Sequence, residues 1–158
     1  MARNHTMHAG QTATPFTCLA EFQWNASSDF SFVFETYRSI ADFNADGAEL
    51  ARLRYRRSPA TGFGAANTTL INQAVTLFLN EMGLGGRGFS VSEFQWFPIQ
   101  KVLTISANKS EQNALFTKRG ADYDAFIVAN AQLFTNLNAA AWTHAKANDV
   151  FLGSMTAV

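Results

Sequence analysis

The chain has 158 residues, a mass of 17.3 kDa and 12 acidic against 12 basic residues. This length suits one domain, and a hydrophobic content of 47% excludes wholesale disorder. Because the net charge is zero, the chain lacks the overall basic character of a dedicated nucleic-acid binder, which leaves only a local patch as a candidate. No apolar run approaches the roughly 18 residues of a membrane span, so we expect no membrane partner.

Residues 1–15 are polar and lack the apolar centre of a secretory signal, so we expect an extended N-terminal arm. Residues 16–158 are then a single domain. Cys18 is the only cysteine and cannot form an internal disulfide. This favours a reducing compartment, either the cytoplasm or a particle assembled inside a cell.

Apolar residues alternate from Phe16 to Trp24, which predicts a strand with one buried face. A second strand begins at Phe30 and is expected to continue to Phe43. The segment 44–47 then reads as a hairpin turn, because its last residue is a glycine. A third strand is predicted over about 48–57.

This three-strand meander can be tested by asking whether one register collects the apolar groups. With a tight turn at 44–47, the large apolar side chains of all three strands share one face. A slip of one residue would send each set to the opposite face, so the agreement supports the meander. The expected pairs include Glu35–Arg56, Phe22–Phe32 and Ala20–Phe34.

The second half of the chain shows helical spacing twice, separated by further strands. Ser110 is expected to cap a short helix that ends at Gly120. The tail from Val150 is expected to add a last strand. The other predicted elements are a loop over 58–66, a helix from about 67 to Gly83, a glycine-rich loop over 83–88, strands over 89–97 and 101–107, and a long helix over 122–148.

These elements predict an α+β fold. We expect a mainly antiparallel sheet of five to six strands, with its aromatic face covered by two main helices, the long one near the C-terminus. The tetrapeptide Glu-Phe-Gln-Trp occurs at 21–24 and again at 93–96. It indicates either a duplicated strand-strand-helix half or two strands that happen to use similar residues.

Four arginines form the one basic cluster: Arg52, Arg54, Arg56 and Arg57. Alternation places the first three on the face opposite the apolar one, with Tyr37 beside them. Such a strand could contact nucleic-acid phosphates or another subunit. It could also be a solvated face whose charges are neutralised by Glu35 and neighbouring acids.

No catalytic constellation stands out, so we expect neither enzymatic activity nor a cofactor. The loop 83–88 lies between a helix and a strand, whereas phosphate loops need a strand followed by a helix. His5, His8 and His144 do not have zinc-site spacing. The acids Glu21, Glu35 and Glu93 could in principle pair as acid and base. Glu21 and Glu35 are expected on one face beside the arginine-rich strand, where ion pairing is the simpler interpretation.

Fifteen phenylalanines in a chain with 15% charged residues leave two interpretations. Either one core is unusually aromatic, or part of the apolar surface is buried against other subunits. We therefore expect a self-assembling structural homo-oligomer, with a virus or phage capsid or tail component as the preferred type. One alternative is a ligand-binding domain or enzyme with an aromatic pocket between sheet and long helix, and another is a nucleic-acid binder using Arg52–Arg57. The pocket would be lined by Trp24, Tyr37, Trp96, Trp142 and His144.

Overall fold

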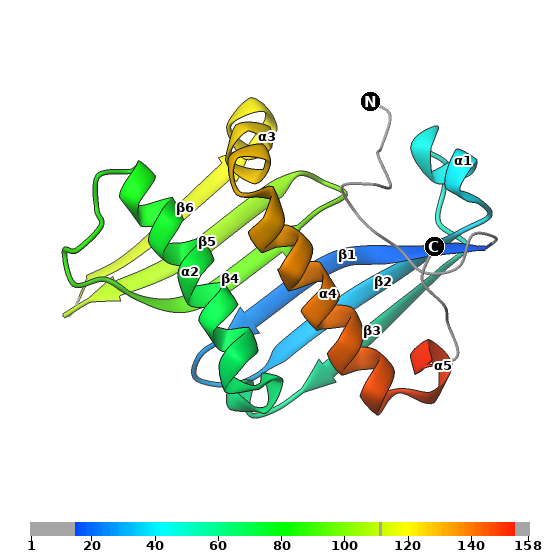
Figure 1. Ribbon diagram of the computed structural model, residues 1–158, viewed down its shortest axis with the longest axis horizontal. Helices are drawn as coiled ribbons and strands as arrows, with labels where there is room; N and C mark the ends of the chain where they lie inside the picture. Colours follow the sequence, from blue (N-terminus) through cyan, green and yellow to red (C-terminus); the bar gives the residue numbers. More distant parts are fainter. Residues whose placement is uncertain (1–14, 111, 154–158) are drawn as a thin grey trace.

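A computed structural model describes residues 15–110 and 112–153. The expected arm, apart from Pro15, and the end of the tail lie outside these residues. The fold is α+β, as the sequence predicted (Figure 1). The elements in chain order are β1 (Phe16–Asn25), β2 (Phe30–Tyr37), α1 (Ile40–Asn44), β3 (Ala51–Arg57), the 3-10 turn η1 (Ala60–Phe63), α2 (Ala65–Glu81), β4 (Ser90–Phe97), β5 (Val102–Lys109), β6 (Gln112–Arg119), α3 (Gly120–Ala129), α4 (Ala131–Asn148) and α5 (Val150–Gly153).

The six strands form one antiparallel sheet in the order β3-β2-β1-β4-β5-β6. Helices α2 and α4 run side by side across one face of this sheet (Figure 1). Among the described residues, no comparable helical layer covers the opposite face, here called the open face. Near the start of β1, Phe43 of α1 packs on this face against Phe16 and Tyr37.

Aromatic rings fill the space between the sheet and the helices. Among the phenylalanines whose burial the structure describes, eleven are buried. Phe22 lies at the centre, with its ring 4.9 Å from that of Phe32, 5.6 Å from Phe94 and 5.7 Å from Phe63. The high phenylalanine content is therefore explained by an aromatic core, the first of the two interpretations of the composition.

The two copies of Glu-Phe-Gln-Trp pair with each other in the middle of the sheet. Gln23 lies opposite Gln95, and each tryptophan lies opposite the phenylalanine of the other copy. The β-bulges of β1 and β4 fall at Ala20 and Ser92, one residue before each tetrapeptide. The strand order is symmetric about the β1–β4 pair. The first half consists of β1, β2, β3 and then α2, and the second half consists of β4, β5, β6 and then α3 and α4. This supports duplication, with three strands in each half instead of the expected two.

The second strand is shorter than predicted, and the predicted hairpin turn at 44–47 is wrong. Strand β2 ends at Tyr37, and the Ser39 hydroxyl then caps α1 by accepting from the Asp42 N–H at 3.0 Å. The connection to β3 is therefore longer, and Glu35 pairs with Arg52 instead of Arg56. The shift is four residues, an even number, so every side chain of β3 stays on its predicted face.

The hairpin between β1 and β2 has the predicted pair Phe22–Phe32. The pair Ala20–Phe34 is wrong, because the bulge at Ala20 brings Leu19 opposite Phe34.

Two helix predictions in the second half are also wrong. Residues 112–119 form strand β6, because Phe116 and its alternate neighbours face the helices while the others face solvent. The long helix is broken at Asn130, whose side-chain amide donates to the Phe126 carbonyl at 2.9 Å and closes α3 before α4 begins. The described part of the tail is the short helix α5 and not a strand.

Candidate functional site on the open face of the sheet

Polar side chains cover most of the open face, because alternate strand residues point away from the aromatic core. Three of the four arginines of β3, at one edge of the sheet, point to this face, and carboxylates lie on the strands next to it. The charged residues on or beside this face are Glu21 on β1, Glu35 on β2, Arg52, Arg54 and Arg56 on β3, Asp29 at the β1–β2 turn and Glu93 on β4.

Arg52 bridges two carboxylates that are almost buried. Its guanidinium donates to Glu35 Oε2 at 2.7 Å and to Glu21 Oε2. The Tyr37 hydroxyl donates to the other Glu35 oxygen at 2.6 Å, and the Gln23 amide donates to Glu21 Oε1 at 2.8 Å. The predicted ion pairing of Glu21 and Glu35 is thus confirmed. Since both carboxylates accept bonds from a guanidinium, their ionised forms are stabilised, which does not suit a general acid.

The remaining arginines differ in their surroundings. Arg54 donates to the Ser31 hydroxyl at 3.2 Å and lies 3.7 Å from Glu21, and Arg56 is bonded to Asp29. Arg57, by contrast, lies on the helix side, where its guanidinium sits 4.2 Å above the Tyr55 ring. Of the four predicted contact residues, Arg52, Arg54 and Arg56 therefore lie beside carboxylates on the open face, whereas Arg57 lies on the helix side of the sheet.

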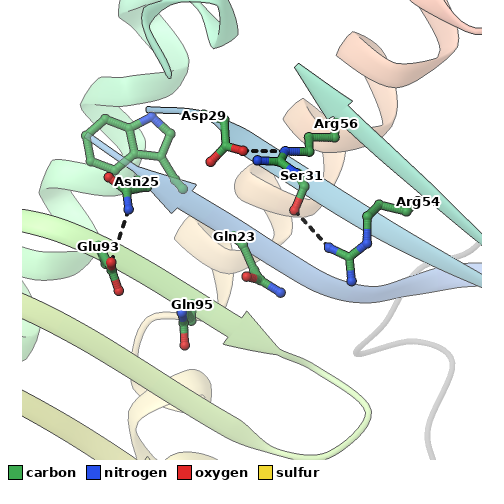
Figure 2. A pocket seen from close by; sticks show the side chains of 9 residues that line it. Gln23, Asn25, Asp29, Ser31, Arg54, Arg56, Glu93 and Gln95 are labelled. Carbon is green, nitrogen blue, oxygen red and sulfur yellow. Dashed lines mark hydrogen bonds and ion pairs between the residues drawn. The ribbon is translucent and has the colours of Figure 1, made fainter. Parts of the chain in front are cut away.

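A shallow hollow of about 370 Å³ lies beside these arginines, where the two tetrapeptide copies meet (Figure 2). Asn25 donates to Glu93 at 3.0 Å on one side of it, and Arg54 and Arg56 close the other side. Its lining side chains are mostly amides, hydroxyls and charged groups: Gln23, Asn25, Asp29, Ser31, Arg54, Arg56, Glu93 and Gln95.

This hollow can bind polar groups through hydrogen bonds, although its Ser31 hydroxyl and its Asp29 and Glu93 carboxylates already accept bonds from Arg54, Arg56 and Asn25. Within residues 15–110 and 112–153, no group of three or more His, Cys, Asp or Glu side chains is placed to hold a metal ion. Sequence reasoning missed Gln23, Gln95, Asn25 and Asp29 as neighbours of the arginines. The repeated tetrapeptide was the available signal, because it places the two glutamines opposite each other once its copies pair.

The residues proposed to line an aromatic pocket do not lie together. Tyr37 is on the open-face side with Phe16 and Phe43, whereas the three tryptophans are buried on the helix side. Rings fill the space there: Phe34 lies 4.4 Å from Trp142. Within the described residues, the indole N–H groups of Trp24 and Trp142 are buried without a hydrogen-bond partner.

His144 lies in the last turns of α4, where both of its ring nitrogens are hydrogen-bonded. Its Nε2–H donates to the Gly62 carbonyl at 3.1 Å, so Nδ1 accepts from the Tyr55 hydroxyl at 3.0 Å. Burial raises the pKa of Tyr55, Arg57 lowers it by a smaller amount, and Asp149 adds to the rise. The tyrosine therefore stays a neutral donor to His144 at ordinary pH.

Cys18 is buried, as expected for a structural thiol, but it packs with Phe16 and Tyr37 on the open-face side, because the bulge at Ala20 reverses the predicted alternation of β1. The loop 83–88 lies between α2 and β4, as predicted. No helix in the described part of the chain is long and apolar enough to cross a membrane. Comparison of the chain with models of protein families, with curated proteins and with solved structures found no match.

Proposed function

We propose that this protein is a self-assembling structural subunit that associates with copies of itself. The observation that carries the proposal is the nearly uncharged outer surface of α2 and α4. The helices have 17 and 18 residues, and Glu81 and Lys146 are the only Asp, Glu, Lys or Arg residues in them; His144 of α4 is the one histidine. The exposed positions are filled instead by small or uncharged residues: Asn72, Gln73, Thr76, Leu77, Thr135, Asn136, Ala139 and Thr143.

Such a surface is unusual for an isolated molecule. A surface designed to stay soluble as a monomer is given about 25–35% charged residues, whereas the centres of protein interfaces are depleted of charge. In this chain the charged groups are concentrated on the open face and in the loops. Most phenylalanines are buried in the core, so the aromatic content does not itself indicate self-association. The support comes from the low number of charged residues on the outer surface of α2 and α4.

The assembly that we favour is a virus or phage particle, in the role of a capsid or tail component. A thin domain with one uncharged helical face suits close packing of many copies. Nucleic-acid binding through Arg52, Arg54 and Arg56 stays a prediction. The carboxylates of Glu21, Glu35 and Asp29 neutralise much of that strand, so the observations favour subunit contact over phosphate contact.

Light scattering coupled to size-exclusion chromatography tests the proposal over a range of protein concentrations. We expect the wild type to elute as an assembly heavier than the 17.3 kDa subunit. The double variant Thr76→Lys and Ala139→Lys places charges on exposed helix positions and should shift the population toward the subunit. Ser28→Lys in an exposed turn is the matched control and should leave the assembly unchanged.

A wild-type protein of subunit mass at every concentration would overturn the proposal. An assembly that the double variant leaves intact would show that the helical face is not the contact. Negative-stain microscopy of the wild type should then distinguish closed particles from filaments.

A further inference from the structure

The sheet has two edges, β3 and β6, and they differ in chemistry (Figure 1). All eight residues of β6 pair with β5 without a bulge. Among the described residues, no strand covers the other side of β6. A long, regular strand edge presents a row of backbone donors and acceptors to any strand that can pair with it.

The symmetry of the two halves allows the edges to be compared residue by residue. The row Glu21–Val33–Arg54 in the first half corresponds to the row Glu93–Ser106–Leu115 in the second. Arg54 is thus replaced by a leucine at the β6 edge. In the same way, the neighbouring Arg52 and Arg56 correspond to Asn113 and Thr117.

This difference decides which edge can accept another copy. Pairing of β3 with itself would bring arginines together, and charged residues on an edge strand are a common device against pairing. Antiparallel pairing of β6 with itself about Leu115 places Lys118 opposite Gln112 and Thr117 opposite Asn113. No like charges then meet among residues 112–118, and Leu115 lies opposite its own copy.

Exposed apolar side chains are concentrated around the same edge. Five large apolar residues are exposed in the described part of the chain, and only Leu50 lies near β3. Leu115 is 69% exposed and lies on β6 itself. Leu77 and Met82 flank Glu81, whose carboxylate accepts from Lys118 of β6 at 2.7 Å, so this end of α2 lies beside the strand. The fifth, Val128, lies on α3, which contacts β6.

We infer that two copies of this protein join through their β6 strands, antiparallel and with Leu115 at the two-fold axis. The two sheets become one sheet of twice the strand number. An axis perpendicular to the sheet keeps both helical layers on one side and both open faces on the other. This inference names one contact within the proposed self-assembly and therefore depends on it.

Disulfide trapping tests the geometry directly. Residues directly opposite in antiparallel strands have Cα atoms about 4.5–5.5 Å apart, which a disulfide can bridge. Under mild oxidation, Leu115→Cys should become a covalent dimer on a non-reducing gel. Leu50→Cys, at the other exposed leucine, is the matched control and should stay uncrosslinked. Cys18 is buried, so it should not contribute in either variant.

A charge exchange tests the two-fold relation. Leu115→Lys and Leu115→Glu each place like charges opposite one another, so each alone should weaken pairing by about tenfold or more. An equimolar mixture of the two should restore a dimer that contains one of each. Each variant is compared with Leu50→Lys.

The outcomes separate this contact from the proposed function. A wild-type assembly whose Leu115→Cys variant does not crosslink would overturn β6 pairing while leaving self-assembly standing. A wild-type protein of subunit mass throughout would overturn both. Both proposals would be supported if Leu115→Cys crosslinks and if mixing the Leu115→Lys and Leu115→Glu variants restores a dimer.

Discussion

Replacing Arg52 with alanine should destabilise the protein by about 2 kcal/mol. Its guanidinium bonds Glu21 and Glu35, whose side chains are only 12% and 11% exposed. Removing one partner of a buried ion pair costs about 3–5 kcal/mol. Because the Arg52 side chain is itself 42% exposed, solvent screens part of this interaction. The Tyr37 hydroxyl, Gln23 and Arg54 also remain beside the carboxylates, which lowers the expected loss further.

Urea unfolding followed by circular dichroism measures this difference. Arg56→Ala is the matched control, because Arg56 is 70% exposed and its bond to Asp29 should contribute no more than about 1 kcal/mol. In a protein that carries Glu21→Gln and Glu35→Gln, removing Arg52 should cost much less, since no buried charge is then left unpaired. The reasoning is refuted if Arg52→Ala costs no more than Arg56→Ala, or the same in both backgrounds.

Three further predictions concern side chains in or next to the aromatic core. Phe22→Ala should cost about 4 kcal/mol by urea unfolding, because it opens a cavity among rings packed on every side; a loss below that of a surface change would contradict the packing described. His144→Phe keeps an aromatic ring but leaves the Tyr55 hydroxyl and the Gly62 carbonyl without their partner, and should lower the free energy of unfolding by about 1 kcal/mol. Burial raises the pKa of Tyr123 above its ordinary value of 10.0, despite the opposing effect of the bond from Trp96. Its neutral form therefore stabilises the fold below about pH 10, and this contribution is lost as the pH rises further, at up to about 1.4 kcal/mol per pH unit. Tyr123→Phe should flatten that decline, and equal slopes in the two proteins would rule out this tyrosine as its cause.

Side-chain alternation made the strands and their faces predictable from the sequence. Phe22 and Phe32 pair as expected, because a strand with one buried face tolerates only registers that keep its apolar residues inside. The same rule explains why a four-residue error in the register of β3 left the faces of β3 correct, whereas the bulge at Ala20 put Phe16 and Cys18 on the face opposite to the predicted one. Sequence patterns failed where a short local interaction competed with a longer pattern, as at Ser39, whose cap ends the strand early, and at Asn130, whose side chain breaks the long helix.

The candidate site was predictable only in part. Alternation placed Arg52 with Glu21 and Glu35, since all three must point away from the aromatic face. It could not bring Gln95 beside Gln23, because 72 residues separate them in the chain and only the pairing of β1 with β4 makes them neighbours.

The amino-acid sequence by itself determined that this chain has an α+β fold, because hydrophobic periodicity acts within each element, but it left open whether the phenylalanines fill a core or a subunit contact. Only the tertiary structure decided that the two halves meet tetrapeptide to tetrapeptide, that the arginine strand forms one edge and β6 the other, and that the outer helical surface is almost uncharged. Strand order and surface exposure depend on contacts between distant segments, and periodicity within a segment does not specify them.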